Sequence, residues 1–223
     1  MTPLVIVPAR AGSKGVPNKN FAQLPDGSTL LDRAVAIGIQ IGHVVLTSDI
    51  NPDDVYTDLT QEQIVKASKH LPQFIQRPKA IAQDDTPMRD VVAHVLDAVP
   101  GPPDQPIVLL QPTTPLRTVE QVRQCLKAAK PCAASVRAIP WAYWRSQTLT
   151  DHYIFLPKTR RQDAMPRYIF SGECYVFPRV WGLHPANSFR AVVLDSEPYV
   201  NVDQPSDWEQ LCEIIRRGQI TAS

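Results

Sequence analysis

Six consecutive apolar residues, Leu4–Ala9 (LVIVPA), form a run with no polar side chain on either face. A strand of this kind is buried on both sides, as in parallel sheets whose two faces are covered by helices. Parallel strands cannot be joined by a hairpin and need a crossover segment, which is usually a helix. The run therefore predicts an α/β arrangement for the chain.

The rest of the chain alternates between short apolar runs and amphipathic segments. We predict strands at 43–49, 74–76, 106–112, 132–138, 174–177 and 191–194. We predict helices at 28–41, 53–70, 87–99, 119–130 and 207–217. Strands and helices that alternate with short links indicate right-handed βαβ units, so we expect a three-layer α/β/α fold around a mostly parallel, Rossmann-like sheet.

Capping residues predict where two of these helices begin. Thr86 precedes Pro87 at the start of an apolar-periodic segment, so Thr86 is the predicted N-cap and Pro87 the first helical residue. In the last helix, Ser206 and Glu209 have the spacing of a capping box, and Gly218 follows the last turn.

The alternation breaks after Ile139. Residues 140–172 contain aromatic residues, turn formers and short β-like runs without a clear helical pattern. We therefore predict a single domain with an insertion, in which 1–139 and 173–223 form the core and 140–172 form a β-rich excursion. An excursion of this kind would serve the acceptor site or dimerisation.

Charge and composition narrow the classes of partner. The chain has 23 basic and 22 acidic residues and a net charge of +1, so no overall field attracts nucleic acid or a membrane surface. No apolar run approaches the roughly 18 residues of a membrane helix, and the short apolar start is typical of a strand rather than a signal peptide. We expect a cytoplasmic protein whose four separated cysteines are reduced thiols.

A basic loop follows the first strand, and residues 8–25 contain no acidic residue. The loop carries three cations and two glycines: Arg10, Gly12, Lys14, Gly15 and Lys19. It fits neither the P-loop pattern nor the dinucleotide fingerprint. Ligands of open α/β sheets bind at the carboxyl ends of the strands, where a glycine-containing backbone and cations suit phosphates. The loop therefore predicts a nucleoside triphosphate site, with a solvated basic turn as the structural alternative.

The motif PARAGSKGVPNKN (8–20) resembles the nucleotide-binding signature of the acylneuraminate cytidylyltransferases, the CMP-sialic acid synthetases. Four further segments resemble that family in the same order. They are LTSD (46–49), RPKAIAQDDT (77–86), LLQPTTPLR (109–117) and NVDQPSDWEQ (201–210). The resemblance implies a nucleotide-diphospho-sugar transferase-like fold, a homodimer, and a reaction in which CTP and an acidic sugar give a CMP-sugar and pyrophosphate.

The resemblance also implies roles by position. The triphosphate would be held by Arg10, Gly12, Ser13, Lys14, Lys19 and Asn20. The rest of the nucleotide would be bordered by Arg77, Asp84 and Thr86. The acceptor would meet Gln111, Thr113, Arg161 and Tyr175. Mg²⁺ would be held by Asp203 and Asn201, and catalysis would depend on Arg10, Lys14 and Asp203.

Structural alternatives stay open for three of these residues. Arg77 could be a surface cation, Gln111 a loop hydrogen-bonding residue, and Asp203 the cap of the final helix.

The chain departs from the family at the metal and acceptor positions. Asn201 stands where relatives commonly carry a second acid, so the metal site would have less charge. Ile169 and Ser171 replace the Arg and Asn that relatives tend to have, whereas Tyr175 is retained. Glu173 is a candidate for contacts with sugar hydroxyls or a second metal.

The motifs therefore predict CTP as the donor and leave more than one acceptor open. A sialic, legionaminic or pseudaminic acid is the leading hypothesis, and a 3-deoxy-octulosonate-like sugar or a small phosphonate is the alternative. A non-catalytic nucleotide-binding protein is the alternative from another class.

Overall fold

The computed structural model describes residues 1–50, 72–138, 168–182, 189–194 and 198–218. Strands in these residues form one sheet with the order β3-β2-β1-β4-β6-β5-β7. They are β1 (Leu4–Pro8), β2 (His43–Ser48), β3 (Gln73–Gln76), β4 (Pro106–Leu109), β5 (Ala133–Ala138), β6 (Tyr168–Pro178) and β7 (Arg190–Val193). Only β6 runs antiparallel to its neighbours, β4 and β5, so the sheet of the described residues is mostly parallel.

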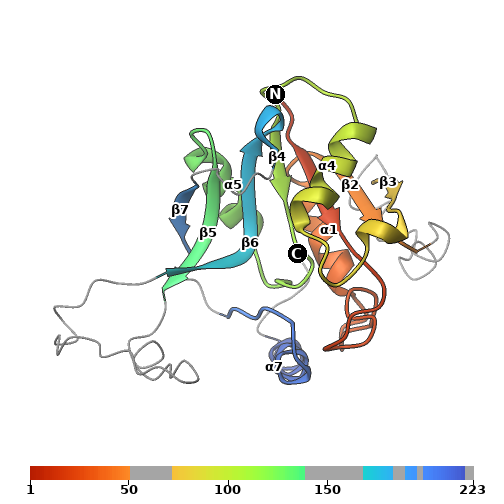
Figure 1. The fold of residues 1–223 in the computed structure, drawn as a ribbon. Coiled ribbons are helices and arrows are strands. Elements are labelled where there is room, and N and C mark those ends of the chain that lie inside the picture. The colour runs from red at the N-terminus through yellow and green to blue at the C-terminus, as the bar shows by residue number, and fades with distance from the viewer. Residues whose placement is uncertain (51–71, 139–167, 183–188, 195–197, 219–223) are drawn as a thin grey trace, which may run out of the picture.

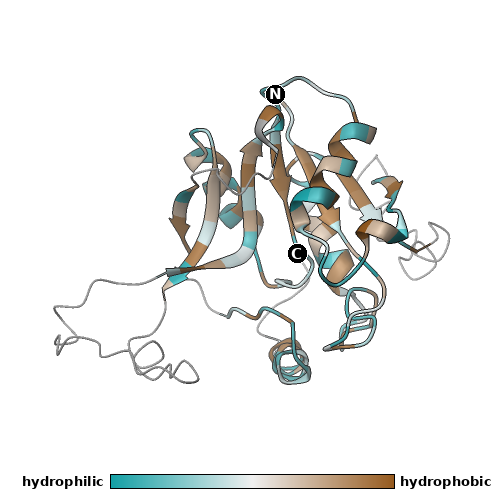
Figure 2. Ribbon diagram, viewed as in Figure 1, coloured by the Kyte–Doolittle hydropathy of each residue, from teal (hydrophilic) through white to brown (hydrophobic). Residues whose placement is uncertain are grey.

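Helices cover both faces of the sheet (Figure 1). On one face lie α1 (Leu30–Ile39) and α5 (Val119–Ala128), and on the other lies α4 (Met88–Ala98). Brown, hydrophobic strands run between helices that also carry teal, hydrophilic positions, as Figure 2 shows. The three-layer α/β/α prediction is confirmed.

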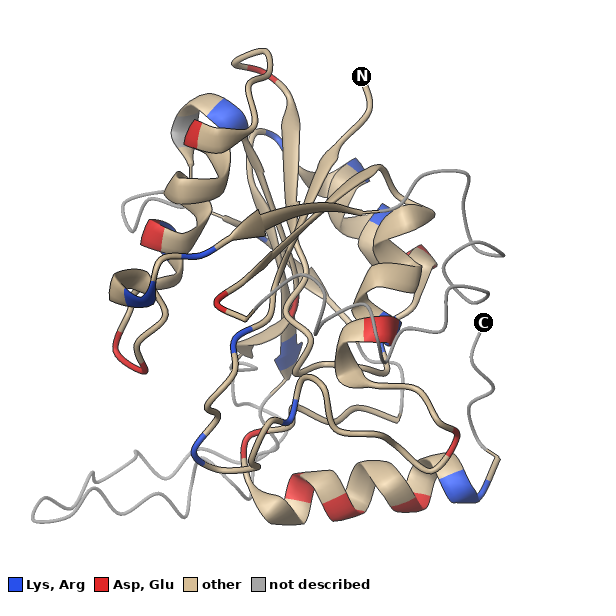
Figure 3. Cartoon of the chain, turned by 90° about the vertical axis from the view of Figure 1, so that its right-hand side faces the viewer, with Lys and Arg blue, Asp and Glu red and all other residues tan. Residues whose placement is uncertain are grey.

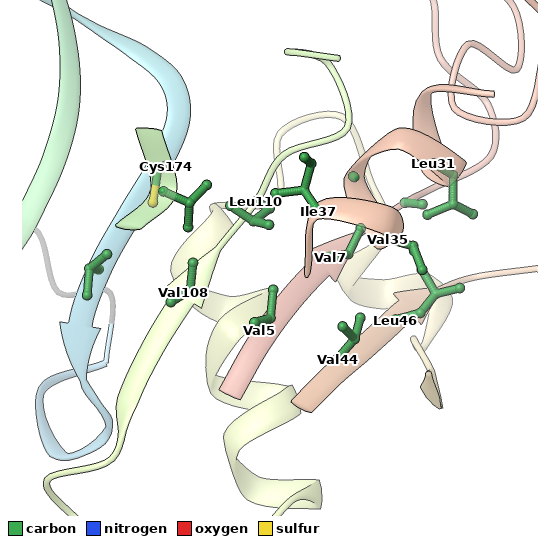
Figure 4. Close-up of a cluster of buried hydrophobic side chains, with 14 of the residues drawn as sticks. Val5, Val7, Leu31, Val35, Ile37, Val44, Leu46, Val108, Leu110 and Cys174 are labelled. Carbon is green, nitrogen blue, oxygen red and sulfur yellow. The ribbon is translucent and has the colours of Figure 1, made fainter. Parts of the chain in front are cut away.

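The core follows from the alternation of side chains along each strand. In β1, Val5 and Val7 pack into the cluster beneath α1 and α5, and Leu4 and Ile6 pack into the cluster beneath α4. Figure 4 shows the first cluster, in which valine and leucine side chains of β1, β2 and β4 meet those of α1. Burial on both faces explains why Leu4–Pro8 has no polar position.

A third apolar cluster joins α7 (Pro205–Arg216) to the basic loop after β1. Leu211 and Ile215 of the helix pack with Val16 of the loop and Val202 of the segment before the helix. In Figures 1 and 3, α7 lies at the end of the molecule towards which the loop extends. This packing brings residues near 15 and 203 together.

The start of α4 differs from the prediction. The helix begins at Met88, and its N-cap is Pro87 rather than Thr86. The Thr86 hydroxyl instead accepts a hydrogen bond from the Gln83 N–H, at 3.0 Å. Two short helices, η1 (Lys79–Ile81) and η3 (Arg179–Trp181), complete the described elements.

The start of α7 also differs, and the predicted capping box of Ser206 and Glu209 is wrong. The helix begins at Pro205, two residues earlier than predicted, because proline has no N–H to satisfy and its φ suits the first helical residue. The Asp207 carboxylate accepts from the N–H groups of Asp203 and Gln204, at 2.9 and 2.8 Å.

Two predicted segments lie wholly or partly outside the described residues. The helix expected at 53–70 is one, and the excursion at 140–172 is described only from Tyr168 onward. Tyr168–Gly172 form the first half of β6, which pairs with β5 in the main sheet. Among the described residues no helix is long and apolar enough to cross a membrane. All four cysteines are free and buried.

Candidate active site

A cleft of about 370 Å³ opens beyond the carboxyl ends of β1 and β4. It is lined by Pro8, Arg10, Ser13, Lys14, Gly15, Lys19, Asn20, Arg77, Asp84, Met88, Gln111, Pro112, Thr113, Asp203 and Gln204. Most of the sequence-predicted nucleotide residues therefore meet at one place. Four of the lining side chains are cationic and two are carboxylates, so the cleft suits an anion.

The basic loop is held by hydrogen bonds that begin where β1 ends. The Asp49 carboxylate accepts from the Ala11 N–H at 2.9 Å, so the residue that ends the LTSD motif supports the loop. The Asn20 amide donates to the Arg10 carbonyl at 3.0 Å and closes the loop on itself. Gly12 adopts φ of 71°, a left-handed conformation that favours glycine.

The two carboxylates of the cleft pair with the cations of the loop. Asp84 forms ion pairs with Arg10 and Lys14, one through each carboxylate oxygen. Lys14 first and then Arg10 lower the pKa of the Asp84 carboxyl by hydrogen bonding. Figure 3 shows basic segments in the loops between the sheet and α7.

Lys19 links the loop to the segment before α7. Its ammonium group donates to the Asp203 carboxylate at 2.9 Å and to the Val202 carbonyl at 2.7 Å. The Val202 N–H donates to the Thr113 carbonyl at 2.8 Å, so the loop after β4 is held in the same place. Asn201 does not line the cleft, but its amide donates to Asp203 at 2.9 Å. Asp203 therefore lies in the cleft and does not cap α7.

Gly15 allows the loop to approach that segment closely. A Cβ atom at this position would lie 2.0 Å from the Asp203 carbonyl oxygen, which is a backbone atom and cannot swing away. The glycine is thus required by contact with protein backbone, whereas the sequence alone suggested contact with an anion.

We expect Gly15→Ala to lower the free energy of unfolding by about 1–3 kcal/mol, because the loop or the Asp203 segment has to move. Urea denaturation of the wild type and the variant measures the change. Equal midpoints and slopes for the two proteins would contradict the close approach.

Arg77 is buried, with 4% of its surface exposed, so its interpretation as a surface cation is wrong. It donates to the Thr47 carbonyl at 3.2 Å, and burial lowers its pKa although Asp49 opposes the shift. Among the described residues, Arg77 Nε and Asn20 Oδ1 are buried without a hydrogen-bond partner. Because both residues line the cleft, a bound ligand could satisfy this donor and this acceptor.

Two of the residues predicted at the nucleotide, Gly12 and Thr86, do not line the cleft. The acceptor predictions divide between the cleft, which Gln111 and Thr113 line, and the aromatic packing around Tyr175. The Tyr175 ring packs against Phe170 and Phe189, with centroids 6.0 and 6.1 Å apart. Arg161 lies outside the described residues.

Arg117 is a buried cation to which the sequence assigned no role. Its guanidinium donates to the carbonyls of Gln111, Thr114 and Glu173, and burial lowers its pKa to about 10. The bonds to Gln111 and Thr114 fold the loop after β4 back on itself, and Gln111 and Thr113 of this loop line the cleft. The feature of the sequence that could have indicated this role is the position of Arg117 as the cation that ends the motif LLQPTTPLR.

Glu173, a candidate contact for sugar hydroxyls or a second metal, is buried beside Arg137 and does not line the cleft. It is 2% exposed and accepts from both Arg137 Nη2 and Arg137 Nε, at 2.7 and 3.2 Å. The Tyr199 ring covers the Arg137 guanidinium at 4.0 Å, and its hydroxyl donates to the Ser171 carbonyl at 2.8 Å. Burial and the Glu173 charge raise the pKa of Tyr199 to about 12.

Of the two predicted metal ligands, Asp203 lines the cleft and Asn201 does not. The described residues contain no group of three or more His, Cys, Asp or Glu side chains that could hold a metal. Mg²⁺ is commonly bound by one or two carboxylates together with substrate phosphates rather than by a protein cage. Asp203, in a cleft lined by Arg10, Lys14 and Lys19, fits an ion shared with phosphates.

The fold and the cleft define an α/β protein with a cation-lined cleft at the carboxyl edge of a mostly parallel sheet, where such folds bind phosphorylated ligands. A sequence model of the cytidylyltransferase family matches residues 4–131. The chain belongs to this family.

A curated relative is the N-acylneuraminate cytidylyltransferase of Escherichia coli O18:K1:H7 (strain RS218 / NMEC), 23% identical over 92% of this chain. This chain spans about half the length of that relative, with 50% covered.

Solved structures show the same fold at low identity. CMP:2-keto-3-deoxy-manno-octonic acid synthetase complexed with CTP has a TM-score of 0.69 and 16% identity, with 98% of this chain and 100% of that chain covered. HddC from Yersinia pseudotuberculosis has a TM-score of 0.62 and 12% identity, with 96% and 100% covered. The 4-diphosphocytidyl-2C-methyl-D-erythritol synthase has a TM-score of 0.59 and 13% identity, with 96% and 99% covered.

Proposed function

We propose that the chain transfers a cytidylyl group from CTP to an acidic acceptor sugar and releases pyrophosphate. The observation that carries the proposal is the convergence of Arg10, Lys14 and Lys19 on one cleft at the carboxyl edge of the sheet. Family membership supports CTP as the donor, and the N-acylneuraminate relative supports a nonulosonic acid such as a sialic, legionaminic or pseudaminic acid. An octulosonate-like sugar or a small phosphonate is the alternative acceptor, the former because of the CMP:2-keto-3-deoxy-manno-octonic acid synthetase structure.

The reaction is an in-line attack by an acceptor hydroxyl oxygen on the α-phosphorus of CTP. The bond between the α-phosphorus and the bridging oxygen breaks, the electron pair leaves with pyrophosphate, and the hydroxyl proton passes to solvent. Catalysis of such a transfer depends mainly on positioning and charge neutralisation. Arg10 and Lys14 would stabilise the departing pyrophosphate, and Lys19 would hold the triphosphate beside Asp203.

Two further sets of residues support the binding of the two substrates, one at the nucleotide and one at the acceptor. The unpartnered Arg77 Nε and Asn20 Oδ1 would be satisfied by polar atoms of the nucleotide. Gln111, whose carbonyl accepts from Arg117, and Thr113, whose carbonyl accepts from the Val202 N–H, line the cleft and would face the acceptor.

Asp203, with the amide oxygen of Asn201, would hold Mg²⁺ together with phosphate oxygens. The bound ion would neutralise negative charge on the phosphates.

The same proposal includes a cytoplasmic homodimer in which the 140–172 segment serves the acceptor site or the dimer contact. Three consecutive apolar side chains of β6 are exposed and support a protein contact in this region. They are Tyr168, Ile169 and Phe170, with 44%, 55% and 60% of their surface exposed.

Pyrophosphate release tests the proposal directly. The assay contains CTP, Mg²⁺ and a panel of sialic, legionaminic, pseudaminic and octulosonic acids with small phosphonates. ATP, GTP and UTP replace CTP in parallel, and a chelator removes the metal. We expect CTP-dependent turnover with one sugar acid. Turnover with a phosphonate alone would overturn the sugar assignment, and CTP binding without any turnover would favour a non-catalytic nucleotide-binding protein.

A further inference from the structure

The acid-free loop after β1 receives a carboxylate from a distant part of the chain. Asp84 lies 74 residues after Arg10, yet its Oδ1 pairs with Arg10 and its Oδ2 pairs with Lys14. One carboxylate thus bridges two cations, as two oxygens of a single phosphoryl group would. Asp84 also lines the cleft, so it occupies space that a bound anion would need.

A braced turn holds Asp84 in this position. The turn follows η1, and its hydrogen bonds run between Gln83 and Thr86 in both directions, at 3.0 and 3.3 Å. The Gln83 side chain also donates to the Lys79 carbonyl at 2.6 Å. Thr86, expected to border the nucleotide, therefore shapes the turn that presents Asp84. The carboxylate faces the cleft because local backbone geometry places it there.

We propose that Asp84 is an internal substitute for one phosphoryl group, which the polyphosphate of the nucleotide displaces from Arg10 and Lys14. The inference rests on the proposed function and adds a specificity element to it. A carboxylate carries one negative charge, and the β,γ portion of a triphosphate carries more, so the cations favour the ligand. Displacement costs little because the side chains of Asp84 and Lys14 are 35% and 84% exposed, and exposed ion pairs are weak.

Two consequences follow for the reaction. A ligand has to bring enough negative charge to Arg10 and Lys14 to replace Asp84, which favours polyphosphates over ligands with one phosphate. After transfer, the carboxylate returns to the two cations as pyrophosphate leaves, and it competes with rebinding.

Asp84→Asn tests the proposal because it keeps the shape of the side chain and removes its charge. Calorimetric titration at neutral pH and low ionic strength compares pyrophosphate, CTP and CMP. We expect pyrophosphate and CTP to bind about fivefold more tightly to the variant, the effect of losing an exposed competing ion pair. CMP binding should be unchanged, and pyrophosphate should become a stronger product inhibitor. Asp85→Asn is the matched control, because Asp85 is an exposed neighbour that does not line the cleft.

Unchanged or weaker pyrophosphate binding by Asp84→Asn would overturn the inference, because Asp84 would then organise the cations rather than compete for them. Equal tightening by Asp85→Asn would also overturn it, since the effect would be one of net charge. If the wild type turns over CTP but Asp84→Asn binds pyrophosphate no more tightly than the wild type does, the inference fails and the proposed function stands. If neither protein binds pyrophosphate or CTP, the proposed function fails together with it. Thermal melting of each variant verifies that it is folded.

Discussion

Lys14→Ala is expected to lower kcat by about 10²–10³, the usual cost of removing one preorganised electrostatic donor from a transition state. Lys14 lines the cleft, and its side chain is 84% exposed, so it is available to a ligand once Asp84 is displaced. The same exposure means that its removal should hardly change the free energy of unfolding. Steady-state kinetics of pyrophosphate release, with CTP as the varied substrate, measures the loss.

Lys127→Ala is the matched control, since it removes an exposed lysine of α5 that does not line the cleft. Its kcat should equal that of the wild type. A Lys14→Ala enzyme with the wild-type kcat and a raised KM would show that Lys14 binds CTP uniformly and does not stabilise the transition state. A wild-type value for both constants would contradict the assignment of the basic loop.

Glu173→Leu is expected to destabilise the fold by about 3–5 kcal/mol, because it removes one member of a buried ion pair and the two hydrogen bonds that this carboxylate accepts from Arg137. Arg137 is 9% exposed and Glu173 is 2% exposed, so water cannot replace the lost partner. Chemical denaturation followed by circular dichroism measures the change.

The double variant Glu173→Leu/Arg137→Met supplies the control. Replacing both members of a buried ion pair by apolar residues is often close to neutral, so most of the lost stability should return. The recovery will be incomplete to the extent that Arg137 also interacts with the Tyr199 ring. If Glu173 instead contacts the acceptor, Glu173→Leu would keep its stability and raise the KM for the acceptor. That result would contradict the structural role.

Much of the fold could be predicted because its signals are local. The run Leu4–Pro8 and its counterpart in β4 lie in strands whose two faces are covered, and short apolar runs bounded by turn-forming residues are typical of such strands. The helix predicted at 119–130 begins at Val119, after a capping box of Thr118 and Gln121. Thr86 was misassigned because the same residue type also stabilises turns, and the turn at Gln83 uses its hydroxyl.

The candidate site was only partly predictable. The loop residues Arg10, Lys14 and Lys19 were found because phosphate-binding loops follow strands and contain glycines and cations. The burial of Arg117 and Glu173 was not predicted, since a charged side chain gives no sign in the sequence of whether it is buried and paired. The retained Tyr175 packs in an aromatic group, although the motif suggested an acceptor contact.

By itself, the sequence determined the layer architecture and the position of a basic loop at the end of the first strand. Both depend on patterns within about ten residues. Hydrophobic periodicity indicates the strands and helices, and the basic loop directly follows the first apolar run. Only the tertiary structure decided the charge partners of that loop. Asp84 reaches Arg10 across 74 residues, and Asp203 reaches Lys19 across 184. Such pairs depend on which loops the order of strands brings to one edge of the sheet, and no local pattern specifies the sign of the charge that arrives there.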